Sequence, residues 1–370
     1  MILLGGRAVS ENMELPKYQR IKDFILNQIN KNELTVNDRI PSETELSKDL
    51  GFSVITVRRA LSELVNEGVI YRVQGKGSFV AEKKVPGREG NDLSKRLVAF
   101  ILSSNEAYDS SFMQMTKGIQ LYLNKHGYSL IIEYSDDSIE KEREIINRLV
   151  AGGIGGLVIF STNPDANADT IMGLKKKGVP FVLIDRYTNA FPVNYVASDN
   201  FDGAYSATQH LIELGHSRIA FLAFDPNLSS ETERYKGYLK ALENAGIHSS
   251  QEIVFLKSPE KNENLVSMIK KNEITAVLSV NDTLAIELLK ICESNGISIP
   301  EDLSVIGFDD IEKSKYQKVP LSTVRQYFQK IGQEAARVLL HAISDPDLGC
   351  TKVLLPVKFI HRNSTSPNRK

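Results

Sequence analysis

Two patterns of apolar residues divide the chain, and the change between them falls near Leu97. In the first part, apolar residues recur every three or four positions, which is the spacing of helices with one buried face. In the second part, short apolar runs alternate with helical segments, which is typical of parallel strands covered by helices on both faces. The pattern therefore predicts an α+β domain followed by a larger α/β domain.

The strongest local signals lie between residues 40 and 80. Ser42 and Glu45 have the spacing of a capping box, in which the hydroxyl and the carboxylate each accept from a backbone N–H that the first helical turn leaves free. The helix that starts there is expected to bury Leu46 and to end at Gly51, because glycine adopts the left-handed conformation that ends a helix at little cost. Only a short turn remains before the next helix.

A second helix is predicted to start at Ser53, which caps it. Its buried face is formed by residues at helical spacing, namely Val57, Ala60, Leu61, Leu64 and Val65. Its first turn and a half carries a second set on the opposite side, namely Val54, Ile55, Arg58 and Arg59. That second set lies where a recognition helix enters the major groove of DNA.

Two short strands are predicted at residues 69–73 and 78–80, on either side of the glycine-rich tip Gln74-Gly75-Lys76-Gly77. Such a hairpin with a cation at its tip is a wing. A helical hairpin in an ordinary protein core has the same apolar spacing, so spacing alone leaves that alternative open. The order of capping box, glycine turn, arginine pair and wing favours DNA binding.

This stretch resembles the GntR type of winged helix-turn-helix, through IPSETELSKDLGFSVITVRRAL and VQGKGSFV. The family usually has an arginine directly after the capping serine of the recognition helix, where this chain has Val54. Val54 or Ile55 is therefore expected to contact a thymine methyl instead of a guanine. Arg58 is the expected reader of a base edge, whereas Lys17, Tyr18 and Arg59 are expected to anchor the DNA backbone. The DNA contacts implied by the resemblance are Lys17, Tyr18, Ser42, Glu43, Ser53, Val54, Ile55, Arg58, Arg59, Gln74, Gly75, Lys76 and Gly77.

Composition fits a protein of two or three domains, with 370 residues, of which 25 % are charged and 42 % hydrophobic. The chain has no long apolar segment, and MILLGG lacks the basic region of a secretory signal, so we expect a cytoplasmic protein with no membrane partner. Because the net charge is only −1, DNA binding has to come from the local placement of cations and should weaken with salt. Cys292 and Cys350 have no metal or redox spacing.

The second part is predicted to form two lobes, each with its own parallel sheet. The expected strands are 97–102, 128–134, 156–160 and 180–185 in one series and 218–224, 252–256, 276–280 and 303–308 in the other. The expected helices are 112–125, 139–150, 165–177, 202–214, 231–245, 262–271 and 283–294.

Polar residues follow several of these strands, at the sheet edge where open parallel sheets bind ligands. Carboxylates that accept from neighbouring hydroxyls, and guanidinium groups that donate two parallel bonds, suit a polyhydroxyl ligand. Phe112, Tyr187 or Phe308 is available to cover the apolar face of a ring. A sugar therefore fits better than a nucleotide, although Asp185 and Arg186 would also make a plain surface ion pair.

The residues give little support for a nucleotide site, a metal site or catalysis. The glycines at 152, 153, 155 and 156 precede a strand, whereas a phosphate loop follows one. His210 and His216 lack a third partner for zinc. We therefore expect no cofactor, no metal and no catalytic residue. A sugar-acting enzyme would need a nucleophile or a phosphate loop, and a transport receptor would lack the DNA-binding part.

The second part resembles the sugar-binding core of LacI-type repressors and periplasmic pentose-binding proteins, through IDR, ERYKGYLKAL, VNDTLAI, PEDLSVIGFDD and LSTVRQ. The resemblance implies a cleft between two lobes. The sugar contacts that it implies are Asp185, Arg186, Arg234, Asn281, Asp309 and Gln326, with Phe112 and Ser104 beside them. Asp282 is expected to cap the helix that begins at Thr283, and Asp310 is expected to be structural.

Together the two parts resemble the arabinose-responsive repressors of bacteria. The expected organisation is a tail (1–13), a winged helix-turn-helix domain (14–82), a linker (83–96) and an effector-binding and dimerisation domain (97–366) whose chain crosses between lobes near 199 and 322. The resemblance implies a homodimer that binds operator DNA and is released by L-arabinose. Another pentose or hexose as effector, and activation instead of repression, stay open.

Overall fold

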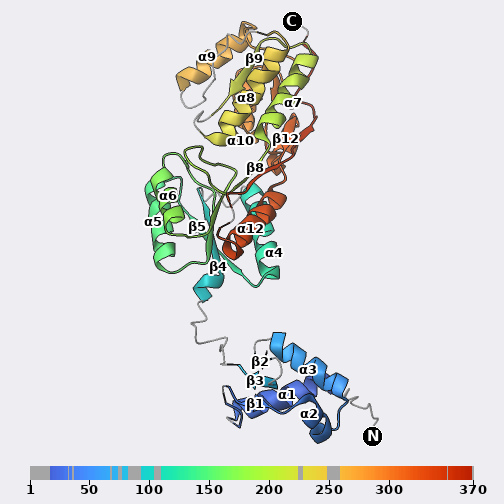
Figure 1. Ribbon diagram of the computed structural model, residues 1–370. Helices are drawn as coiled ribbons and strands as arrows, with labels where there is room; N and C mark the ends of the chain where they lie inside the picture. Colours follow the sequence, from blue (N-terminus) through green and yellow to red (C-terminus); the bar gives the residue numbers. More distant parts are fainter. Residues whose placement is uncertain are drawn as a thin grey trace, which may run out of the picture. The chain divides into compact units, whose positions relative to one another are not determined.

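The computed structural model describes residues 17–31, 33–35, 37–66, 69–73, 77–81, 93–103, 110–223, 228–247, 259–347 and 349–368. The chain forms two compact units, Met1–Leu93 and Ser94–Lys370 (Figure 1). We call the first unit the head and the second unit the core domain. None of the described helices is long and apolar enough to cross a membrane.

The head packs three helices against a small antiparallel sheet. The helices are α1 (Lys17–Asn30), α2 (Glu43–Leu50) and α3 (Val54–Asn66). The strands are β1 (Arg39–Ile40), β2 (Ile70–Val73) and β3 (Gly77–Val80), in the order β1-β3-β2. Their core contains the residues that the apolar spacing indicated, among them Ile21, Ile25, Leu46, Val57, Leu61 and Leu64.

The predicted capping signals of α2 are confirmed. The Glu45 backbone N–H donates to Ser42 Oγ at 3.3 Å, and the Ser42 N–H donates to Glu45 Oε2 at 2.7 Å, which completes the capping box. Gly51 ends the helix with a φ of 70°, in the left-handed region. These two signals set the length of α2 and hence the position of the turn before α3.

The first lobe of the core domain is built on a six-stranded parallel sheet in the order β13-β8-β7-β6-β4-β5. Its strands are β4 (Leu97–Leu102), β5 (Ser129–Tyr134), β6 (Gly156–Ile159), β7 (Phe181–Ile184), β8 (Tyr195–Ser198) and β13 (Lys352–Leu355). Its helices are α4 (Ser110–Lys125), α5 (Ile139–Ala151), α6 (Ala168–Lys176) and α12 (Phe328–Ser344), and a 3-10 turn, Leu93–Arg96, precedes β4. Helices α4 and α12 cover one face of the sheet, and α5 and α6 cover the other (Figure 1).

The second lobe contains a three-stranded parallel sheet and a separate antiparallel strand pair. The sheet strands are β9 (Ile219–Leu222), β10 (Ala276–Ser279) and β11 (Ser304–Ile306), and the pair is β12 (Thr323–Arg325) with β14 (Lys358–Ile360). The helices are α7 (Asn200–Glu213), α8 (Ser229–Asn244), α9 (Pro259–Lys270), α10 (Asp282–Ser294) and α11 (Glu312–Lys315). The strand expected at 252–256 lies outside the described residues.

The chain passes between the lobes three times. It leaves the first lobe after β8, returns to it between β12 and α12, and leaves again between β13 and β14. The sequence indicated only two crossings, near 199 and 322. The third was missed because most residues of β13 and β14 are exposed or half-buried, so these strands do not form the continuous apolar runs that mark the buried ones.

Candidate functional site

Helix α3 separates its core residues from its predicted contact residues. Ser53 caps the helix, because the Thr56 N–H donates to its Oγ at 3.3 Å. Ile55 is 78 % exposed, and Arg58 and Arg59 are also exposed, whereas Val57 is fully buried. The side chains predicted to meet DNA therefore lie on the solvent face of α3.

Glu43 holds two arginines from different elements of the head. Its Oε2 accepts from Arg58 Nε of α3 at 2.8 Å, and its Oε1 accepts from Arg72 Nη2 of β2 at 3.0 Å. One carboxylate faces two guanidinium groups, so this cluster keeps a net positive charge. Arg58 has to share or leave Glu43 in order to reach a base edge.

Two of the predicted backbone anchors, Tyr18 and Arg59, are in contact. The Arg59 guanidinium lies over the Tyr18 ring, 4.3 Å from its centroid, and Arg59 Nε donates to Glu63 at 3.4 Å. Lys17 is exposed at the start of α1. Gly77 opens β3, and the wing residues Gln74, Gly75 and Lys76 lie outside the described residues.

Arg234 is the centre of a buried polar cluster in the second lobe. The residue is 5 % exposed, and its Nε donates to Asn200 Oδ1 at 2.8 Å, while Nη1 donates to the Val280 carbonyl. Its Nη2 lies 3.6 Å from Asp309 Oδ1. The guanidinium also lies over the Phe308 ring, 3.9 Å from its centroid. The suggestion that Phe308 covers a ligand ring is wrong, because this arginine already covers a ring that is fully buried.

Gln326 joins the same cluster from the crossing between β12 and α12. Its Nε2 donates to Asp309 Oδ1 at 2.6 Å. Its Oε1 is buried and has no hydrogen-bond partner among the described residues. Three of the predicted sugar contacts, Arg234, Asp309 and Gln326, therefore meet in the structure.

The cap of α10 differs by one residue from the expectation. Asn281 is the N-cap, since its Oδ1 accepts from the Leu284 N–H at 2.8 Å, and Asp282 is the first helical residue. The expected cap role of Asp282 is therefore wrong. Because Asn281 Oδ1 accepts the cap hydrogen bond, the Nδ2 amino group of this side chain is the part left to donate to a ligand.

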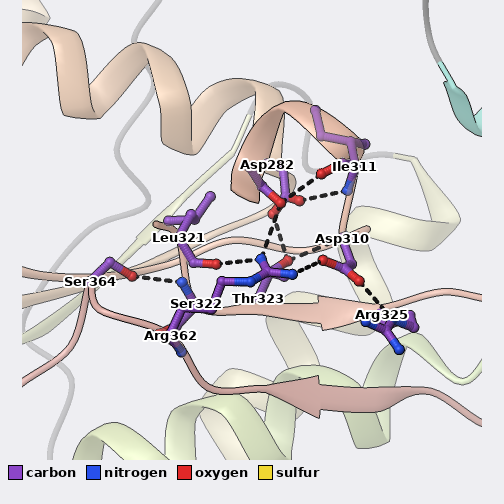
Figure 2. A network of polar contacts seen from close by, with 10 residues as sticks. Asp282, Asp310, Ile311, Leu321, Ser322, Thr323, Arg325, Arg362 and Ser364 are labelled. Atoms are coloured by element: carbon purple, nitrogen blue, oxygen red, sulfur yellow. Dashed lines mark hydrogen bonds and ion pairs between the residues drawn. The ribbon is translucent and has the colours of Figure 1, made fainter. Parts of the chain in front are cut away.

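Asp282 and Asp310 belong to a further polar network of the second lobe (Figure 2). Asp282 is fully buried and accepts from the Thr323 hydroxyl at 2.6 Å and from the Ile311 N–H at 2.9 Å. Burial, followed by the charge of Asp309, raises the pKa of Asp282 well above its usual range, while the Thr323 bond acts in the opposite direction. Asp310 contacts two arginines, which agrees with the structural role expected of it.

The first-lobe residues form a second cluster at the end of β7. Arg186 Nη1 donates to the carbonyls of Ser161 at 3.3 Å and Thr162 at 3.0 Å, and its guanidinium lies over the Phe160 ring at 4.8 Å. Its Nε is buried without a partner among the described residues. Phe112 packs edge-on against the Phe160 ring, with centroids 5.2 Å apart.

Asp185 takes part in the turn that follows β7. It is 9 % exposed and has a φ of 65°. Among the described residues, no ion pair joins Asp185 to Arg186, so the two are not the surface pair considered as an alternative. The strained backbone conformation favours a positioning role for the turn.

Glu142 supports this cluster and was not singled out in the sequence. The fully buried carboxylate accepts from Ser161 Oγ at 2.6 Å, from the Thr162 N–H at 2.7 Å and from Asn167 Nδ2 at 2.6 Å. It thereby fixes the two residues whose carbonyls hold Arg186. In the sequence it stands among other charges in a helical segment and looks like part of a solvated face.

Next to Arg186 in the sequence, the Tyr187 N–H of the first lobe donates to Ser229 Oγ of the second lobe at 2.8 Å. Tyr187 stacks on Tyr195, with ring centroids 4.0 Å apart, and burial raises its pKa. Ser104 lies outside the described residues. Within the described part of the chain, no three His, Cys, Asp or Glu side chains are grouped to hold a metal.

Two family models match separate parts of the chain. Residues 17–80 match the model of bacterial regulatory proteins of the gntR family, and residues 208–365 match that of the periplasmic binding protein-like domain. The matches agree with the head and with the parallel sheets of the core domain, so the predicted fold class is confirmed.

Similar proteins align with most of the chain. The arabinose metabolism transcriptional repressor of Halalkalibacterium halodurans is 29 % identical over 365 residues, which cover 95 % of this chain and 96 % of that protein. The repressor of the same name from Geobacillus stearothermophilus is 28 % identical and covers 95 % and 98 %. The structure of a LacI family transcriptional regulator from Enterococcus faecium with bound ribose is 30 % identical, has a TM-score of 0.63, and covers 74 % of this chain and 100 % of its own.

Proposed function

This chain belongs to the LacI family of transcriptional regulators and carries a GntR-type head, and on that basis we propose that it is a repressor that L-arabinose releases from operator DNA. It is a regulator and not an enzyme. The head supplies the DNA contacts, and the core domain supplies the sugar site. The choice of L-arabinose as effector is supported by the names of the two relatives that align along 95 % of the chain.

The observation that carries the sugar assignment concerns two of the six buried side-chain atoms that lack a partner among the described residues. They are Arg186 Nε, a donor, and Gln326 Oε1, an acceptor. Leaving such an atom unpaired costs about 1–3 kcal/mol, so a ligand that pairs with it gains that energy. A hydroxyl both donates and accepts, so a polyol has the acceptor that Arg186 Nε needs and the donor that Gln326 Oε1 needs.

Arg234 and Asp309 complete the polar set for such a ligand. The 3.6 Å between Arg234 Nη2 and Asp309 Oδ1 is longer than a good ion-pair hydrogen bond, which leaves Arg234 Nη2 able to donate to a ligand hydroxyl. The Phe308 ring beneath Arg234 and the bond to Asn200 keep the guanidinium in one orientation. A preorganised donor of this kind lowers the entropic cost of binding a small ligand.

Release from DNA follows from linkage between the two sites. A sugar that binds one arrangement of the lobes more tightly than the other shifts the population toward the tighter-binding arrangement. A tenfold to hundredfold loss of operator affinity needs about 1.4 to 2.7 kcal/mol of differential binding, which is within the usual range. By reciprocity, operator DNA weakens sugar binding by the same factor.

A homodimer is the assembly that fits this function. A head of one copy reads one half-site, and a second copy reads the symmetric half-site one helical turn or a multiple of it away. A change in the spacing of the two heads then weakens both contacts together.

A thermal-shift panel of pentoses and hexoses tests the effector. L-arabinose at about 100 times its Kd should stabilise the protein by about 2.7 kcal/mol, a rise in Tm of about 5 to 10 °C. D-arabinose is the matched control, because it has the same composition and mirror-image hydroxyl positions. Stabilisation by a hexose or a phosphorylated sugar, with none from L-arabinose, would show that the effector assignment is wrong.

A further inference from the structure

Two of the three crossings between lobes are held at their second-lobe ends by residues of the sugar site, and the third enters β14, which pairs with β12. The first crossing ends at Asn200, which accepts from Arg234 Nε at 2.8 Å. The second contains Gln326, which donates to Asp309 at 2.6 Å. The residue that follows Asp309 pairs with two arginines at the antiparallel strand pair of β12 and β14.

That residue is Asp310, and it holds Arg325 of β12 and Arg362, which follows β14 (Figure 2). Arg325, the last residue of β12, donates from its Nε to Asp310 Oδ2 at 2.6 Å. Arg362, two residues beyond β14, donates from its Nη2 to Asp310 Oδ1. The Asp310 side chain is 3 % exposed, so both ion pairs are shielded from water at the carboxylate.

The backbone fixes Asp309 and Asp310 as a unit. Asp309 has a φ of 111° and Asp310 a φ of 56°, both unusual for residues with side chains. The Asp309 N–H donates to the Val324 carbonyl of β12 at 2.7 Å, and the next residue, Ile311, donates to buried Asp282 at 2.9 Å. A turn clamped in this way does not move its two carboxylates independently.

We propose that Asp310 is a positioning residue that transmits sugar binding at Asp309 to the second and third crossings. When sugar hydroxyls bind Asp309, they compete with Gln326 for the same carboxylate oxygen, and the crossing into α12 is released at that point. Arg325 and Arg362 stay on Asp310, so the strand pair keeps a fixed end about which the lobes turn. Without the Asp310 charge, sugar still binds, but the crossings no longer move as one.

Asp310→Asn in the full chain tests this proposal, which rests on the proposed function. L-arabinose affinity is measured by calorimetry, and operator affinity is measured by fluorescence anisotropy with and without L-arabinose. We expect the variant to keep its sugar affinity within threefold, and its ratio of operator affinities without and with sugar to fall at least fivefold. Glu293→Gln is the matched control, since it removes an exposed ion pair with Lys318 in the same lobe and should change neither quantity.

Different outcomes would overturn the role of Asp310 and the proposed function. A variant with a lowered Tm and an unchanged affinity ratio overturns the inference, because a purely structural role moves only the Tm. A wild-type protein that binds L-arabinose without any change in operator affinity overturns the proposed function, and the inference with it. If Asp310→Asn does not fold, Arg325→Gln carries the same prediction, because its side chain is 38 % exposed and its removal leaves the Arg362 pair in place.

Discussion

Arg58 and Arg59 are a matched pair for testing how the head reads DNA. They are neighbours on α3, and their side chains are 60 % and 64 % exposed. Each makes one ion pair on the surface of the head, with Glu43 at 2.8 Å and with Glu63 at 3.4 Å. Replacing either with alanine therefore removes the same charge and one exposed ion pair, and Arg59→Ala also removes the contact with the Tyr18 ring.

The two replacements should nevertheless have different effects on binding. A bidentate contact to a base is worth about 1–3 kcal/mol of discrimination, so Arg58→Ala should lose about 5- to 150-fold on the correct operator and stop distinguishing one base pair. Arg59→Ala should weaken binding to every duplex by a similar factor and lower the log–log salt slope by about 1. Exposed ion pairs contribute about 0–1 kcal/mol to folding, so loss of stability does not imitate either result.

The assay is fluorescence anisotropy on a duplex selected from a random library by the wild-type protein. Single-base-pair variants of that duplex measure discrimination, and three salt concentrations measure the slope. The reasoning is refuted if Arg58→Ala weakens all duplexes equally while Arg59→Ala relaxes sequence choice.

Three further predictions concern the core domain. Asp282→Asn should gain stability relative to wild type as pH rises above about 4, because burial raises the folded-state pKa of Asp282 above its unfolded value and the wild type therefore loses stability. Urea denaturation of both proteins at several pH values checks this, and a stability difference that does not change with pH would refute it. Gly118→Ala should lower the free energy of unfolding by about 1–3 kcal/mol, because the added Cβ would overlap the Gln329 carbonyl of α12. Gly173→Ala is the control and should not destabilise the protein, because open space surrounds that position. Equal urea midpoints for the two variants would contradict this prediction. Arg234→Met should abolish the thermal shift with sugar, and an undiminished shift would remove this arginine from the site.

The sequence was most informative where a local pattern determines the local structure. The capping box of Ser42 and Glu45, and the glycine at position 51, were both predicted and are both present. The alternation of apolar runs after Leu97 likewise indicated the parallel strands, because a strand buried on both faces is a continuous apolar run.

The sequence was least informative where a contact joins distant positions. Nothing near Phe308 shows that Arg234 covers its ring, and nothing near Glu142 shows that three donors surround it in the core. Both depend on residues brought together only by the fold. The shift of the α10 cap from Asp282 to Asn281 is a one-residue error of the kind that adjacent capping residues allow, since either side chain can accept from the first turn.

Operator affinity of the full chain, with and without saturating L-arabinose, tests the central claim most directly. The account predicts an affinity at least tenfold weaker with L-arabinose and unchanged with D-arabinose. Equal operator affinity in all three conditions, with calorimetry showing that L-arabinose is bound, would contradict it.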